Sequence, residues 1–270
     1  MNWRIGLFCL LGGLCFTVSA AGTGHFGWWL LSGVLIAAAV TPIVIYGPRG
    51  MGAQFIAISL SIIVVGLVCT ISEGILFFPE KRAEMMRGLW GGIALYLIAS
   101  AVMAGLAFLL KLRRESTTSA ESKPVTTAAA MVLVGALSYV LYYFVFGAIT
   151  FQFFTKRYYP HAVEQTAALG GWFWAYQFTR GLIMVLAALP VIYTLRLPRW
   201  RAAVAVGSLI WVVGGLAPLL VPNAEMVPLQ RFEHILEIFT QNFSLGVTAT
   251  LLLRRSPAAS IKPAQHLTTA

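Results

Sequence analysis

The sequence predicts an all-α membrane protein, a bundle of about eight transmembrane helices with both termini in the cytoplasm. Composition is the first reason, because 59% of the 270 residues are hydrophobic and only 10% are charged. The mean hydropathy is +0.82. Soluble domains carry about 25% charged residues, so this chain has too few polar side chains to cover a water-soluble surface. The second reason is that the apolar residues come in long stretches.

The charged residues exclude further classes of protein. The chain has 19 Lys and Arg, nine Glu and no Asp, which gives a net charge of +10. In a membrane protein, Lys and Arg concentrate in cytoplasmic loops and contact lipid head groups. No basic run lies on a soluble region that could bind nucleic acid. We therefore expect the lipid bilayer as the main partner, and neither nucleic acid nor a cofactor.

Eight apolar stretches are long enough to cross a bilayer, whose core of about 30 Å needs roughly 20 residues per helix. They are 5–20, 28–46, 51–78, 89–110, 128–154, 171–195, 202–221 and 234–253. The first is the shortest, and residues 18–21 resemble the small-residue cleavage site of a secretory signal. The sequence leaves open whether this segment is cleaved. Pro42 and Pro190 lie inside spans, where they predict kinks.

A polar segment rich in Ser, Thr and charge separates the fourth and fifth spans. It predicts a first transmembrane half at 1–110, a flexible cytoplasmic linker at 111–127 and a second transmembrane half at 128–255. The remaining residues, 256–270, are predicted to be a disordered cytoplasmic tail.

The orientation follows from the distribution of Lys and Arg. With the amino terminus inside, twelve of these residues fall in the inner segments, six fall in the outer loops, and Arg180 lies within a span. This bias predicts that both termini are cytoplasmic. We expect a multi-pass protein of a cell membrane, and of the bacterial inner membrane in particular.

Acidic residues and histidines concentrate on the opposite side, with seven of nine Glu and three of four His outside. Acids contribute little to topology, so this bias is not a consequence of orientation. Counting along the third, sixth and eighth spans brings Glu73, Arg180, His234 and Glu237 to a similar depth in the outer leaflet. An ionisable group at this depth costs a few kcal/mol unless it is paired or hydrated. We therefore expect Arg180 to pair with Glu73 or Glu237.

The eighth span has a polar helical face. Its members, spaced three or four residues apart, are Gln230, His234, Glu237, Gln241, Ser244 and Thr248. A weaker polar face on the fifth span consists of Tyr139, Tyr142, Tyr143 and Thr150. Such faces turn towards the bundle interior or a water-filled cavity.

Two interpretations of these residues require no chemistry. In the first, the charges are structural and the polar faces hold helices together. In the second, they line an outward-facing path for a small solute or a proton. The residues of that path would be Arg180, Gln241, Ser244, Thr248 and Tyr143.

Two other interpretations are chemical. In an enzyme site, His234 would be the general base, Glu237 or Glu73 its orienting carboxylate, and Arg180 an anion clamp. In a metal site, His234 and Glu237 would be joined by His161 or Glu73, but two ligands are not a site, and we expect no metal.

No short motif identifies an enzyme family. The chain has no Gly-rich phosphate loop, no G-x-S-x-G and no H-E-x-x-H. We therefore predict a non-enzymatic transport or structural component of the membrane, with a polar cluster that opens to the outer face and a small molecule or lipid as its ligand. The alternative is a membrane-embedded enzyme with an outward-facing His/Glu/Arg site. The sequence does not determine the oligomeric state.

Overall fold

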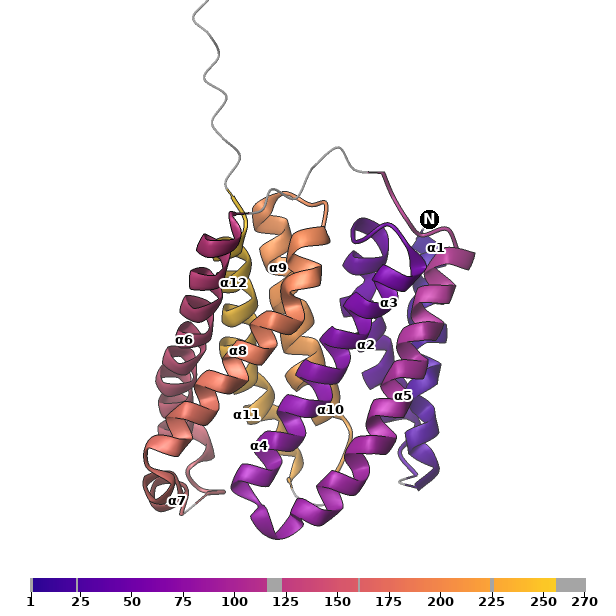
Figure 1. Cartoon of the computed structure of the whole chain (residues 1–270). Coiled ribbons are helices and arrows are strands. Elements are labelled where there is room, and N and C mark those ends of the chain that lie inside the picture. The colour runs from indigo at the N-terminus through magenta and orange to yellow at the C-terminus, as the bar shows by residue number, and fades with distance from the viewer. Residues whose placement is uncertain (1, 23, 116–122, 160, 224–225, 256–270) are drawn as a thin grey trace, which may run out of the picture.

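The computed structural model is a bundle of long helices that run roughly side by side (Figure 1). It describes residues 2–22, 24–115, 123–159, 161–223 and 226–255, and all regular structure in them is helical. Eight of these helical stretches are long and apolar enough to cross a membrane, which confirms the predicted all-α polytopic bundle. Part of the predicted linker (116–122) and the whole predicted tail (256–270) lie outside the described residues.

The first four spans follow one another closely in the chain. Span one is α1 (Asn2–Leu14) with the 3₁₀ segment η1 (Cys15–Gly22), and span two is α2 (Phe26–Tyr46). Span three joins α3 (Met51–Ser59), the π-helical segment η2 (Leu60–Val68) and α4 (Cys69–Phe77), and span four joins η3 (Pro79–Lys81) and α5 (Arg82–Leu109). Span four starts at Pro79 rather than at 89, because proline suits the first turn of a helix and the polar residues after it extend the helix beyond its apolar part.

The second four spans include one short helix between membrane crossings. Span five is α6 (Val125–Thr150) with the π-helical segment η4 (Phe151–Thr155), and span six is α8 (Gly171–Thr194), which follows the short α7 (Ala162–Leu169). Span seven joins α9 (Arg199–Trp211), the π-helical segment η5 (Val212–Leu216) and α10 (Ala217–Leu220). Span eight joins α11 (Pro228–Ile238), the π-helical segment η6 (Phe239–Phe243) and α12 (Ser244–Leu253). It starts at Pro228 rather than at 234, so His234 lies nearly two turns into the helix.

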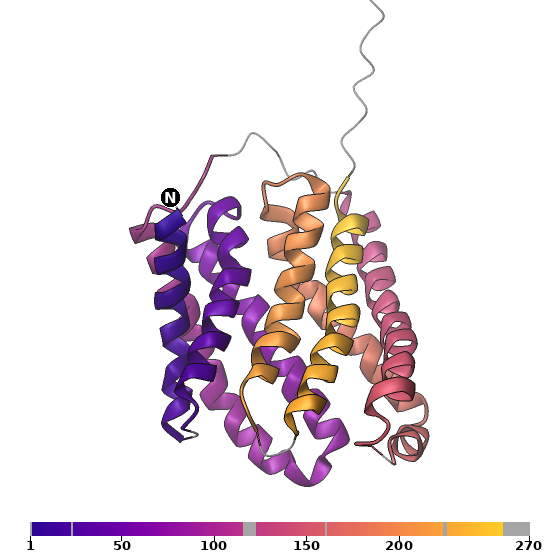
Figure 2. The same cartoon turned by 180° about the vertical axis from the view of Figure 1, so that it is seen from behind.

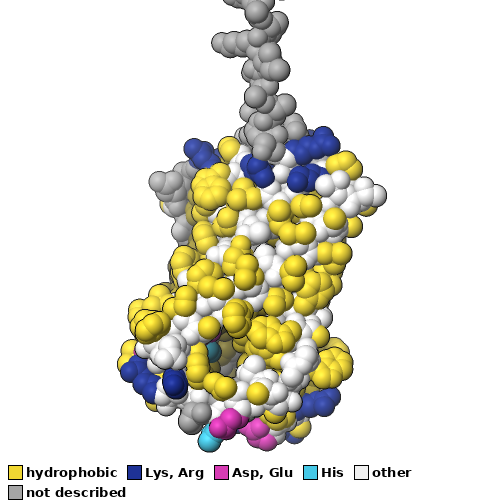
Figure 3. All heavy atoms as spheres, turned by 90° about the vertical axis from the view of Figure 1, so that its left-hand side faces the viewer, with side chains coloured by type: hydrophobic (Ala, Val, Ile, Leu, Met, Phe, Trp, Pro, Cys, Tyr) yellow, Lys and Arg dark blue, Asp and Glu magenta, His cyan; other side chains and the backbone are white. Residues whose placement is uncertain are grey.

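The start of α1 and the end of α12 lie at the same end of the bundle (Figures 1 and 2). We call this the terminal end and the opposite one the distal end. The turns after Phe77 and the short helix α7 belong to the distal end. On the face shown in Figure 3, hydrophobic side chains cover the middle of the molecule and Lys and Arg lie towards both ends. This is the surface expected of a bundle that crosses a bilayer.

Close helix packing depends on small residues. The helix pairs that pack most extensively are α1 with α2, α6 with α8, and α9 with α12. In the third pair, Gly207 and Gly246 face each other, and in the first pair Gly13 faces Gly33. Since lipid provides no hydrophobic drive for helix association, such close backbone approach supplies the van der Waals contact that holds spans together.

Three of the π-helical segments meet inside the bundle. Gly66 of η2 contacts Val213 of η5, and Gly214 of η5 contacts both Val65 of η2 and Asn242 of η6. A π-helical segment widens the helix by one residue per turn and is frequent at functional sites. In span eight, η6 separates Glu237 from Ser244, so the register of the predicted polar face changes at this point.

The terminal end is packed by apolar side chains and by backbone hydrogen bonds from two loops to the last turn of α2. Leu112, Leu195 and Leu253 are almost completely buried there. The Arg114 backbone N–H donates to the Ile45 carbonyl (3.1 Å), and the Arg196 N–H donates to the Tyr46 carbonyl (2.8 Å). These contacts join the segments after α5 and after α8 to the last turn of α2.

Candidate functional site

An ion pair between Arg180 and Glu73 links span six to span three. Arg180 Nη1 donates a hydrogen bond to Glu73 Oε1 over 2.5 Å. Arg180 lies in the middle of α8 on its buried face, together with Gln177 and Gly181. Gly181 contacts the backbone of α6, so α8 and α6 approach closely beside the arginine. The sequence left two partners open for Arg180, and the observed one is Glu73.

A second ionisable pair lies on span eight. His234 Nδ1 is 2.9 Å from Glu237 Oε2, and Gln241 Nε2 donates to Glu237 Oε1 over 3.2 Å. The residues are three and four positions apart, so one helical face holds the chain of hydrogen bonds. Gly147 of α6 faces Glu237 and Gln241, and the absence of a side chain there lets α6 lie against them.

Tyr143 of α6 lies between the two pairs. Its hydroxyl donates to Glu73 Oε1 over 3.4 Å. The side chain is close enough to both Glu73 and Glu237 to interact electrostatically with each carboxylate. His234 in turn interacts electrostatically with Glu73 and Arg180 as well as with Glu237. We call these six residues the polar cluster: Glu73, Tyr143, Arg180, His234, Glu237 and Gln241.

Exposure differs among the members of the polar cluster. The exposed fraction of the side chain is 26% for His234 and 24% for Glu73, then 13% for Glu237 and 4% for Arg180. The face of the molecule in Figure 3 is hollowed towards the distal end, and a histidine side chain is visible inside the hollow. The cluster is thus partly exposed at His234 and at Glu73, and buried at Arg180.

Further polar atoms without a protein partner surround the buried part of the cluster. Gln177 is completely buried one turn before Arg180, and neither atom of its amide is hydrogen-bonded to any described residue. The same holds for the Tyr139 hydroxyl and for Arg180 Nε. A buried amide that lacks partners costs about 1–3 kcal/mol, so these atoms favour a hydrated or ligand-binding interior.

Aromatic rings form the walls of the cluster. Tyr143 contacts the rings of Tyr139 (6.1 Å between centroids) and Phe173 (5.7 Å), and the Arg180 guanidinium lies 5.7 Å from the centre of the Tyr139 ring. On the open side, the centre of the Tyr159 ring lies 6.1 Å from that of His234, with the two rings tilted by 32°. Burial raises the pKa of Tyr159, so its hydroxyl stays neutral at physiological pH.

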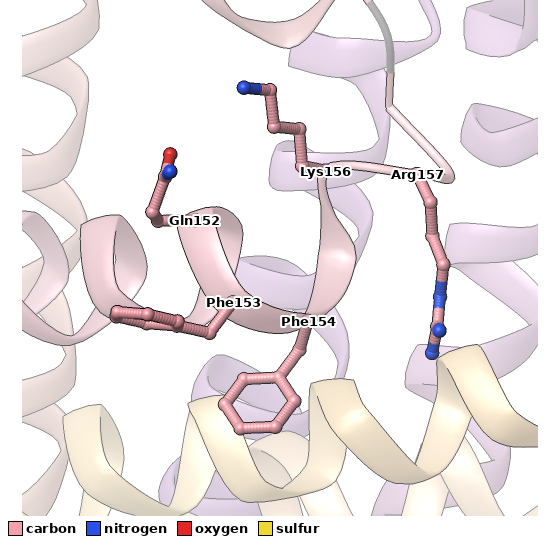
Figure 4. A pocket seen from close by; sticks show the side chains of 5 residues that line it. All are labelled: Gln152, Phe153, Phe154, Lys156 and Arg157. Atoms are coloured by element: carbon pink, nitrogen blue, oxygen red, sulfur yellow. The ribbon is translucent and has the colours of Figure 1, made fainter.

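The turn at the distal end of span five connects this site to α11. A surface hollow of about 340 Å³ is lined by Gln152, Phe153, Phe154, Lys156 and Arg157 (Figure 4). Arg157 extends from this turn to pair with the nearly buried Glu233 on α11.

Three of the residues predicted for the solute path or the metal site lie outside the polar cluster. Thr248 Oγ1 is 2.7 Å from the Tyr142 hydroxyl, so this contact joins spans eight and five nearer the terminal end. Ser244 is half-buried beyond η6. His161 is exposed and pairs with Glu164 at 3.0 Å. Among the described residues no three His, Cys, Asp or Glu side chains gather as metal ligands, so His161 does not join His234 and Glu237.

Two residues of the site were missed by sequence reasoning. Gln177 precedes Arg180 by three residues, and this helical spacing is a signal that could have revealed it. Tyr159 follows a helix in a loop, where no periodicity exists to predict a contact with His234. The Arg157–Glu233 pair was missed for the same reason, because it joins a loop to a helix that is distant in the sequence.

The fold and the buried charges define a multi-pass α-helical membrane protein. No known protein family, curated protein or solved structure matches this chain. The function therefore has to be inferred from the residues of the site.

Proposed function

We propose that this protein is a carrier that takes up a small polar solute or proton at the polar cluster and moves it across the membrane. The observation that supports this best is that one set of interacting side chains includes two partly exposed ionisable groups, His234 at 26% and Glu73 at 24%, beside the buried Arg180 at 4%. Ionisable side chains inside a membrane are costly, and they commonly mark the path of an ion or substrate. An ion pair that only stabilised the bundle would not require partly exposed ionisable side chains next to it.

The asymmetry of the bundle also supports a carrier. The polar cluster is partly open towards the distal end, whereas buried leucines and hydrogen bonds from two loops to α2 pack the terminal end. A carrier exposes its site to one side of the membrane at a time. Three π-helical segments meet between the two ends, and such segments are frequent at functional sites.

The proposed orientation places the distal end outside the cell. Reporter fusions check this: a reporter joined after Arg114, at the terminal end, is expected to be active only if it functions in the cytoplasm. A reporter joined after Arg157, at the distal end, is expected to be active only if it functions outside. The physical reason is the excess of Lys and Arg at the terminal end. The reverse pattern would place the polar cluster on the cytoplasmic side and contradict an outward-facing site.

Access of water to the inner part of the path distinguishes a carrier from other functions. On a background in which Cys9, Cys15 and Cys69 are replaced, Thr248→Cys is expected to react with a membrane-impermeant thiol reagent. The expected rate is several-fold higher than that of Leu245→Cys, a matched control on the same helix whose native side chain is fully buried in apolar packing. The reason is that Thr248 faces the polar residue Tyr142. Equal protection of both cysteines would contradict a continuous path.

A second candidate function is an enzyme whose site faces the same side. It is favoured by one observation, that Glu237 holds His234 through Nδ1, so that the other ring nitrogen, Nε2, can act as a base. The same cysteine experiment separates the two functions. An enzyme needs access only at His234, so His234→Cys would react with the reagent and Thr248→Cys would stay protected.

A further inference from the structure

The charges of the carboxylates and the arginine in the polar cluster do not cancel. Arg180 contributes one positive charge, while Glu73 and Glu237 contribute two negative charges. His234 balances them only when it is protonated. The charges that act on His234 are those of Glu237 on its own helix, Glu73 on α4 and Arg180 on α8; Tyr143 on α6 and Tyr159 in the loop after η4 are neutral. The nearby Arg157 and Glu233 neutralise each other.

The surplus negative charge of the polar cluster has a direct physical consequence. An uncompensated carboxylate at this depth is costly, and the cost is removed by a proton on His234 or by another cation bound beside Glu237. The two are alternatives, because both together would give the cluster a net positive charge. The cluster is therefore suited to exchange one monovalent cation for one proton.

The surroundings of the carboxylates determine the kind of cation. Hard metal ions require about six oxygen ligands, but one of the two carboxylates here is engaged by Arg180, and the other carboxylate is held by His234 and Gln241. Aromatic faces are abundant instead, from Tyr139, Tyr143, Phe173 and Tyr159. Ring faces attract ammonium and quaternary ammonium groups within about 6 Å, and Arg180 already makes such a contact with Tyr139.

We propose that the polar cluster binds a small organic monocation, a protonated amine or a quaternary ammonium, and that binding releases the proton of His234 to the outer solution. The ammonium group lies beside Glu237 against the rings of Tyr143 and Tyr159. One positive charge enters and one proton leaves, so the charge of the cluster is unchanged. This inference rests on the proposed carrier function and adds the class of solute.

The test uses the full-length protein in lipid nanodiscs, with tetramethylammonium as the probe and Na⁺ at equal concentration as the control cation. Tetramethylammonium is expected to raise the midpoint of thermal unfolding, and Na⁺ is not. Because the probe competes with a proton, its affinity is expected to rise with pH, by up to about tenfold per pH unit while His234 is protonated in the free protein. A weakly buffered sample is expected to acidify on binding.

Three variants test the roles of the residues. His234→Gln retains a donor for Glu237 and removes the titrating group, so the probe is expected to bind with no dependence on pH and no proton release. Glu237→Gln removes the surplus charge and is expected to weaken binding by at least about tenfold. Glu164→Gln, at an exposed carboxylate on α7, is the matched control and is expected to bind like the wild type.

Two results would overturn the inference: equal effects of Na⁺ and tetramethylammonium, or binding to His234→Gln that still releases a proton. The reactivity of Thr248→Cys in the same nanodiscs separates this failure from a failure of the carrier function. A reactive Thr248→Cys without tetramethylammonium binding means that the path exists and the solute belongs to another class. A protected Thr248→Cys contradicts the carrier itself.

Discussion

Replacing Arg180 with alanine is expected to lower the stability of the protein by about 3–5 kcal/mol, the range observed when one partner of a buried ion pair is removed. Arg180 is 4% exposed, and its Nη1 bonds to Glu73 over 2.5 Å. Without the guanidinium, Glu73 remains in the bundle with the hydroxyl of Tyr143 as its one other donor in the part of the chain that the structure describes. In thermal unfolding of the detergent-solubilised protein, the midpoint is expected to fall by about 10 °C.

The double variant Arg180→Ala with Glu73→Gln identifies the cause of this loss. If the main penalty is the unpaired carboxylate, neutralising Glu73 is expected to restore part of the stability of Arg180→Ala. Neutralising Glu237 in the same background is expected to restore less, because its hydrogen bonds come from His234 and Gln241. Arg87→Ala, at an exposed position, is the control and should unfold like the wild type. An Arg180→Ala protein that unfolds at the wild-type temperature would show that the pair contributes no stability.

Gly246→Val is expected to destabilise the bundle by about 3 kcal/mol, the upper part of the range for overpacked sites. A Cβ atom at Gly246 would lie 2.6 Å from the Cα and 2.7 Å from the N of Gly207. Both atoms belong to the backbone of α9, so no side chain can rotate to make room. The helices α9 and α12 would have to separate, and the packing of the fully buried Leu245 and Ala249 would be lost.

The control for this variant is Gly105→Val on α5, where a Cβ atom meets nothing within 4 Å. It is expected to leave the unfolding midpoint unchanged or to raise it slightly, since glycine is the weaker helix former. Thermal unfolding of both proteins in the same detergent checks the prediction. Equal midpoints for the two variants would mean that the contact between Gly207 and Gly246 is not required for the packing of α9 against α12.

The spans could be predicted from the sequence because hydrophobic length is a local property of the chain. The predicted starts of spans four and eight were the least accurate, because these helices begin at Pro79 and Pro228. Hydropathy detects the part of a helix inside the hydrocarbon, whereas the helix itself continues through polar residues at the membrane surface. The π-helical segments had no detectable signal, since they depend on how neighbouring helices pack.

The buried charges could also be anticipated, and for a related reason. The depth of Glu73, Arg180, His234 and Glu237 follows from counting residues along each span. The bond from His234 to Glu237 follows from their helical spacing, because both lie on one face of α11. Local geometry alone is sufficient for such contacts.

By itself, the sequence determined that this is a helical membrane protein, and it predicted which ionisable residues lie at a similar depth. Only the tertiary structure decided that Arg180 pairs with Glu73, that Tyr143 lies between the two pairs, and that Tyr159 covers His234. The physical reason is that a bilayer fixes the position of a residue along its normal but not the order of helices within its plane. That order depends on side-chain shape and on close contacts such as Gly207 with Gly246, which hydropathy does not encode.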